Sequence, residues 1–169
     1  AANALALSAL TPPWGQIYCH RNAHIEEDEA GAPELFSGGA KLALLDGAHG
    51  KIAAETLADA IAGAGFGVQH HPQPSAISLT QATEAGTAYQ PDEVAALAKI
   101  AHGAGLSVHM DGARFANAVA YLGCSPAEAT WKAGVDVLSF GATKNGAMAA
   151  EAVIFFDPDA AGDFLYRRK

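Results

Sequence analysis

A regular alternation of short β-prone runs with longer alanine-rich stretches of helical spacing constrains the fold of this chain more than any other feature. Strands that alternate with helices of ten or more residues build crossover units, and such units place their strands in a mainly parallel sheet. The sequence therefore predicts an α/β fold with a mainly parallel sheet flanked by helices. The expected strands cover residues 16–20, 41–46, 76–81, 107–111, 135–141 and 152–157.

The clearest expected helix begins at Pro91, because proline suits the first helical turn. Asp92 and Glu93 put negative charge near the positive end of this helix, and Gly103 and Gly105 provide its end. Further helices are expected over residues 1–10, 52–64, 115–122 and 126–133.

Composition describes an acidic, core-forming chain. Half of its 169 residues are hydrophobic, which excludes a disordered protein, and no apolar run reaches the roughly 20 residues that a membrane-spanning helix needs. The formal net charge of −8 disfavours nonspecific binding to nucleic acid or anionic lipid. The two cysteines, Cys19 and Cys124, are too few for a disulfide scaffold or a zinc cluster. We therefore expect a cytoplasmic protein without a nucleic-acid, membrane or metal partner.

One expected strand ends in an acidic turn. Residues 106–110 deliver Asp111 to the carboxyl edge of the sheet, where ligands of parallel sheets bind, and Gly112 permits an immediate turn. A carboxylate held there can bind a cation or a protonated ring nitrogen, and Arg114 can bind an oxyanion. Taken alone, the segment is explained at least as well by an ordinary Asp-Gly turn with a surface arginine.

The next expected strand ends in a loop of small residues that contains a single lysine, Lys144, between Thr143 and Asn145. Such a lysine can approach a bound ligand closely and act as a nucleophilic amine, although a solvated loop lysine is the simpler explanation. Together, Asp111 and Lys144 suit pyridoxal phosphate. The aldehyde of this cofactor forms a Schiff base with a lysine, and a fixed carboxylate keeps its ring nitrogen protonated.

The run His-Met-Asp-Gly-Ala-Arg at residues 109–114, followed by residues 115–118 and 139–146, resembles the threonine aldolase/β-eliminating lyase family of pyridoxal-phosphate enzymes. The similarity extends over essentially the whole chain and includes residues 1–7, 23–26, 30–34 and 77–89. Members of this family have the aspartate-aminotransferase fold. The resemblance thus implies the large domain of a fold type I pyridoxal-phosphate enzyme.

The resemblance implies roles for four residues in cofactor binding. Lys144 would hold pyridoxal phosphate through the Schiff base, and Asp111 would pair with the pyridine nitrogen. His24 would stack on the pyridine ring. Arg114 would lie near the phenolic oxygen of the cofactor and the carboxylate of the substrate.

A fifth residue, His70, is implied near the hydroxyl-bearing side chain of the substrate. There it would take the hydroxyl proton directly or through a water that it orients. Its neighbour His71 is the competing assignment. No pair of histidines has the spacing of a metal site, and the chain contains neither CxxC nor HExxH.

The resemblance also implies a reaction: retro-aldol cleavage of a β-hydroxy-α-amino acid, L-threonine or L-allo-threonine, to glycine and an aldehyde. β-Elimination, racemisation and transamination stay open, because the reaction depends on which bond at Cα stands perpendicular to the cofactor ring. A nicotinamide-dependent dehydrogenase is disfavoured, since no GxGxxG follows the first expected strand. Family members assemble as homo-oligomers, so a homodimer or homotetramer is implied.

The ends of the chain bear on its domain organisation. Compared with the family, residues 1–169 correspond to a partial cofactor-binding large domain, without the N-terminal arm and the C-terminal small domain. The Gly-Thr pair that helps to hold the cofactor phosphate in relatives would directly precede Ala1. A truncated, inactive fragment is therefore the alternative expectation.

Overall fold

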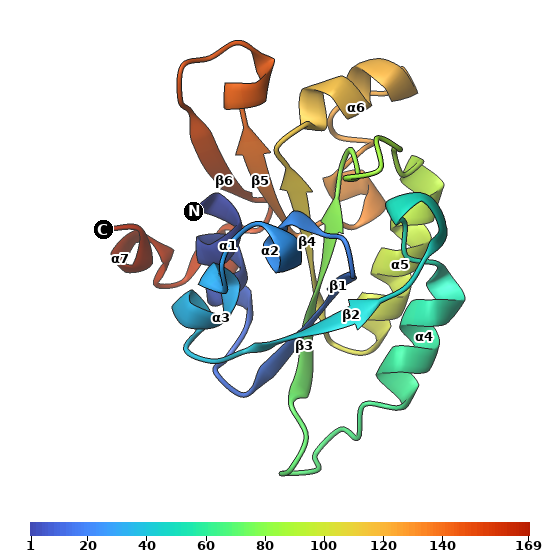
Figure 1. The fold of residues 1–169 in the computed structure, drawn as a ribbon, viewed down its shortest axis with the longest axis vertical. Helices are drawn as coiled ribbons and strands as arrows, with labels where there is room; N and C mark the ends of the chain where they lie inside the picture. Colours follow the sequence, from blue (N-terminus) through green and yellow to red (C-terminus); the bar gives the residue numbers. More distant parts are fainter.

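In the computed structural model, which describes residues 1–169, six strands form one sheet in the order β2-β1-β3-β4-β5-β6 (Figure 1). The strands are β1 (Gly15–His20), β2 (Lys41–Leu45), β3 (Gln73–Thr80), β4 (Ser107–Gly112), β5 (Val137–Gly141) and β6 (Glu151–Phe155). The first five run parallel, and β6 is antiparallel to β5. The mainly parallel sheet is thus confirmed, and every expected strand is present with small shifts at its ends.

Helices lie on both faces of this sheet (Figure 1). The α-helices are α1 (Ala2–Leu10), α2 (His24–Glu27), α3 (Ala32–Ser37), α4 (Ala54–Ala62), α5 (Pro91–Gly103), α6 (Phe115–Leu122) and α7 (Phe164–Arg168). Four short 3-10 helices are η1 (Ala48–Gly50), η2 (Trp131–Ala133), η3 (Thr143–Asn145) and η4 (Pro158–Ala161). Helix α5 begins at Pro91 as predicted, and Glu93 Oε2 accepts a hydrogen bond from the backbone N–H of Gln90 at 2.7 Å.

The helix predicted over residues 126–133 is wrong. This segment consists of turns that end in η2. Thr130 leaves the helical region, with φ −130° and ψ −106°, while its hydroxyl donates to the carbonyl of Pro126 at 2.6 Å. The helical spacing of apolar residues is therefore not enough to form a helix here, because the backbone leaves the helical region at Thr130.

Two apolar cores cover the two faces of the sheet. Side chains alternate along β1, so Ile17 packs with Leu7 of α1 on one face, whereas Tyr18 belongs to the larger core that contains Leu57 of α4 and Leu97 of α5. Because both faces of the sheet are covered, the carboxyl edge of the strands is the region accessible to a ligand. No helix in the structure combines the length and the apolar character needed to cross a membrane.

Candidate active site

Asp111 stands at the carboxyl end of β4, in the middle of the sheet. It pairs in register with Thr80 of β3 and Ser139 of β5, and it is only 3% exposed. The chain turns immediately afterwards at Gly112, where an added Cβ would lie 2.6 Å from Leu138 Cδ1 and 2.8 Å from the carbonyl oxygen of Ser139. The close approach of β5 therefore requires glycine at this position, and the Asp-Gly pair places a buried carboxylate at the sheet edge.

Two donors fix the orientation of the Asp111 carboxylate. The backbone N–H of Ala113 donates to Oδ1 at 3.0 Å, and the side-chain amide of Asn3, at the start of α1, donates to Oδ2 at 2.8 Å. A carboxylate that is fixed in orientation is what the pairing with a protonated ring nitrogen requires.

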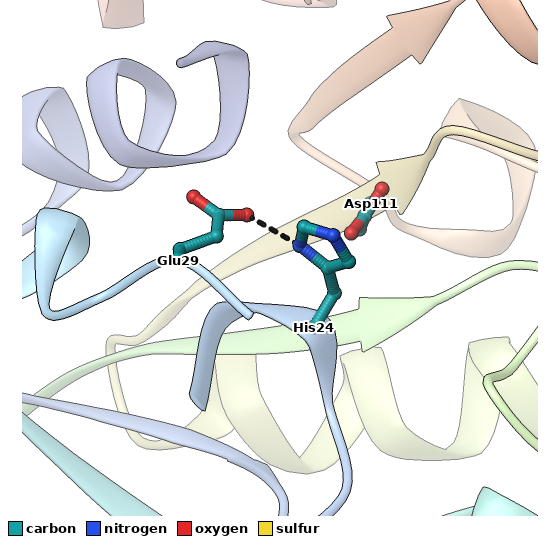
Figure 2. Close-up of side chains that lie close together, drawn as sticks. All are labelled: His24, Glu29 and Asp111. Carbon is teal, nitrogen blue, oxygen red and sulfur yellow. Dashed lines mark hydrogen bonds and ion pairs between the residues drawn. The ribbon is translucent and has the colours of Figure 1, made fainter. Parts of the chain in front are cut away.

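His24 begins α2, shortly after β1 reaches the same edge of the sheet. Its Nδ1 lies 3.0 Å from Glu29 Oε1, and the same oxygen accepts a hydrogen bond from the Asn3 amide at 2.8 Å. Figure 2 shows the imidazole ring of His24 between the carboxylates of Glu29 and Asp111. One ligating atom from each of these three residues lies within 4.8 Å of the other two, a spacing that a metal ion could also bridge.

A cavity of about 400 Å³ opens in front of this cluster. Lys144 reaches it from η3, which follows β5, and its side chain is exposed. The structure thus brings Lys144, Asp111 and His24 to one cavity. The lining residues are Ala1, Ala2, Asn3, His24, Asp28, Glu29, Ala32, Asp111, Ala113, Ser139, Lys144 and Glu151.

Arg114 is close in sequence but does not line this cavity. Its guanidinium donates to Glu84 Oε1 at 3.1 Å, and Glu84 lies in the loop that follows β3. Arg114 therefore sits at the correct edge of the sheet, paired with a carboxylate of the protein.

The structure does not bring His70 to the site. His70 is exposed in a turn before Gln73, the first residue of β3, whereas Asp111 pairs with Thr80 at the other end of that strand. Eight residues of strand span roughly 25 Å. The α4–β3 connection lies at the bottom of Figure 1, away from the carboxyl ends, and His71 shares this position. Both histidines therefore lie at the opposite end of β3 from the cavity of their own chain.

One buried histidine, His109, was assigned no role from the sequence. His109 lies on β4 below Asp111, with Nδ1 2.9 Å from Ser78 Oγ of β3 and Nε2 2.9 Å from Ser139 Oγ of β5. Burial lowers the pKa of His109 to about 4, although the Asp111 carboxylate acts in the opposite direction. The signal was its place two residues before Asp111, since residues i and i+2 share one face of a strand. His109 thus joins three strands directly beneath the site.

The family model described as beta-eliminating lyase matches residues 1–169. The chain belongs to the beta-eliminating lyase family. Low specificity L-threonine aldolases from Pseudomonas aeruginosa and from a second Pseudomonas strain are 53% and 48% identical to it over 169 residues. Each match covers 100% of this chain and 48% of the relative, so the chain spans about half the length of these curated relatives.

Solved structures agree with this membership. The threonine aldolase of Leishmania major matches with a TM-score of 0.82 and 28% identity, over 98% of this chain and 48% of that one. A PLP-dependent aminotransferase from Streptococcus suis matches with a TM-score of 0.71 over 99% of this chain and 42% of that one, and at 15% identity it shares the fold alone. The predicted resemblance to the large domain of fold type I pyridoxal-phosphate enzymes is confirmed.

Proposed function

We propose that this protein is a pyridoxal-phosphate-dependent aldehyde-lyase that cleaves a β-hydroxy-α-amino acid, such as L-threonine or L-allo-threonine, to glycine and an aldehyde. The observation that carries the proposal is the cavity in which the buried Asp111 carboxylate and the amino group of Lys144 meet. The 53% identity to a low specificity L-threonine aldolase supports the choice of reaction. Residues 1–169 would form the cofactor-binding part of the large domain.

The residues of the cavity fit the cofactor. A volume of about 400 Å³ lies in the range of small-molecule sites. Asp111 offers a buried carboxylate for a protonated ring nitrogen, and Lys144 offers an amine for an aldehyde carbon. The N-terminal end of the nine-residue helix α1 also faces the cavity through Ala1, Ala2 and Asn3, and the free N–H groups of a helix N-terminus suit a phosphate.

Bound pyridoxal phosphate would supply the electron sink that accepts the electron pair of the breaking Cα–Cβ bond. Asp111 would hold a proton on the pyridine nitrogen, since Asn3 and Ala113 fix the orientation of its carboxylate. Lys144 would bind the cofactor carbonyl carbon through Nζ and release it to the amino group of the substrate. His24 would limit the tilt of the ring from the side of α2.

The proton of the substrate hydroxyl needs an acceptor within reach of the cavity. Because His70 lies at the opposite edge, we propose that a group lining the cavity, or a water held there, accepts this proton. Arg114 would neutralise the substrate carboxylate only after exchanging its present partner Glu84.

The location and the assembly are also proposed. Both cysteines are free, which supports a cytoplasmic location. A homodimer or homotetramer is proposed from the family.

The test is an absorbance spectrum of the purified protein with pyridoxal phosphate, before and after reduction with borohydride. We expect a band near the visible edge, and peptide mapping after reduction should find the cofactor on Lys144. Lys144→Ala should lose this attachment, whereas Lys132→Ala, at an exposed lysine beside Trp131, should keep it. Attachment that persists in Lys144→Ala would contradict the assignment.

Product analysis tests the reaction itself. With L-threonine and L-allo-threonine as substrates, the proposal requires glycine and acetaldehyde in equal amounts. Keto acid from serine would instead indicate β-elimination, and D-alanine from L-alanine would indicate racemisation. Either of these as the main activity would replace the aldehyde-lyase proposal.

A further inference from the structure

One carboxylate oxygen at the rim of the cavity receives two hydrogen bonds from different elements. Glu29, in the turn after α2, accepts at Oε1 from Asn3 of α1 at 2.8 Å and lies 3.0 Å from Nδ1 of His24 at the same oxygen. Its side chain is only 9% exposed. With Glu29 as the acceptor of this contact, His24 carries a proton on Nδ1. The Nε2 atom of His24 takes no part in this contact.

The Asn3 amide extends this arrangement to Asp111. Its Nδ2 donates to Glu29 Oε1 and to Asp111 Oδ2, each at 2.8 Å. An amide nitrogen has two N–H bonds and the amide oxygen has none, so only one orientation of Asn3 can serve two carboxylates. Glu29 and Asp111 together therefore determine which way Asn3 points, and Asn3 in turn holds the carboxylate that would meet the cofactor.

The hydrogen bonding of the Glu29, Asn3 and His24 side chains is incomplete. Glu29 Oε2 and Asn3 Oδ1 are buried and have no hydrogen-bond partner, although both residues line the cavity. Buried acceptors without a donor cost free energy, and Glu34 Oε2, outside the cavity, is in the same state, so the position of the cluster decides its role. The placement beside His24 and Asp111 favours a role in the site.

We propose that Glu29 is a positioning residue, which holds His24 directly and Asp111 through Asn3 in the arrangement that receives the cofactor. This inference rests on the proposed function for the identity of the cofactor. It assigns Glu29 no contact with the reacting atoms. Figure 2 shows the direct contact with His24 and the neighbouring Asp111.

The first experiment needs no cofactor. Nitrogen-15 NMR of the histidine side chains should find a proton on Nδ1 of His24 in the wild-type protein. Glu29→Met removes the acceptor at similar volume, so it should shift His24 towards the Nε2–H tautomer that free histidine prefers. Glu34→Met is the matched control, because Glu34 is half-buried on α3 and does not line the cavity. An Nε2–H tautomer in the wild-type protein would overturn the inference.

The second experiment measures the dissociation constant of pyridoxal phosphate and the circular dichroism of the bound cofactor. We expect Glu29→Met to weaken binding by about tenfold or more and to change the induced band, since hydrogen bonds to a charged acceptor are lost. Glu29→Gln keeps an acceptor oxygen and should recover part of both signals. Glu34→Met should behave as the wild-type protein.

The outcomes separate this inference from the proposed function. A wild-type protein that binds no pyridoxal phosphate would refute the function, and the NMR result would still decide whether Glu29 holds His24. Unchanged affinity and an unchanged band in Glu29→Met would overturn the positioning role. Equal losses of affinity and melting temperature in Glu29→Met and Glu34→Met would also overturn it, because they would indicate a general structural effect.

Discussion

Acidification from pH 7 to pH 5 should destabilise this protein through His109. The imidazole is fully buried between Ser78 and Ser139, and this burial lowers its pKa to about 4. In the unfolded chain a histidine has a pKa of roughly 6.5. Between these two values the unfolded state binds a proton that the folded state does not.

The sign and the size follow from this difference in bound protons. Stability falls as pH falls, because protonation favours the unfolded state. The contribution of a neutral His109 is present in full above about pH 6.5 and is lost progressively down to about pH 4. A pKa difference of about 2.5 corresponds to about 3 kcal/mol in all, of which about 2 kcal/mol is lost between pH 7 and pH 5.

Urea unfolding at pH 7, 6 and 5 measures this loss. His109→Gln replaces the imidazole with a side chain that can donate and accept hydrogen bonds but does not titrate, so its free energy of unfolding should fall by about 2 kcal/mol less than that of the wild-type protein over the same pH range. His70→Gln makes the same change at an exposed position and serves as the control. Parallel pH profiles for His109→Gln and the wild-type protein would refute the reasoning.

Two further predictions concern other parts of the fold. Burial raises the pKa of Cys19 to about 12, so its thiol should not react in the folded protein. An alkylating reagent at pH 8 should therefore modify the half-buried Cys124 first and reach Cys19 only in urea. Mass spectrometry reads the labelled residue, and prompt labelling of Cys19 in the native protein would contradict this. Gly134→Ala should lower the free energy of unfolding in urea by about 2 kcal/mol, because φ is +94° and the new Cβ would lie 2.6 Å from Ala98 Cβ. Gly123→Ala has a similar φ of +67° with open space around it, so it should cost only about 1 kcal/mol, and an equal cost for both would exclude the clash.

The strands and most helices could be predicted because their signals are local. Period-2 runs and helical spacing arise from neighbouring residues, so β4 and its exit at Asp111 were found from the chain alone. The placement of Lys144 followed for the same reason, since the carboxyl ends of parallel strands share one edge. The prediction for residues 126–133 failed because the backbone leaves the helical region at Thr130, which the spacing of apolar residues does not encode.

The other half of the site depended on contacts that no local pattern encodes. Glu29 and Asp111 are 82 residues apart by number, and one amide, that of Asn3, bridges them only because α1 packs against the sheet beside β4. In the same way, a family likeness names His70 without stating that it lies at the far end of β3 from the cavity.

The sequence by itself determined the α/β class, the family, and the presence of an acidic turn and a lysine loop at one sheet edge, because these follow from short-range periodicity and a contiguous motif. Only the tertiary structure decided the strand order, the burial of His109 between two serines, and the hydrogen bonds that join His24, Glu29 and Asn3 to the site. The physical reason is that burial and side-chain hydrogen bonds depend on which segments pack together. That packing is a property of the whole folded chain.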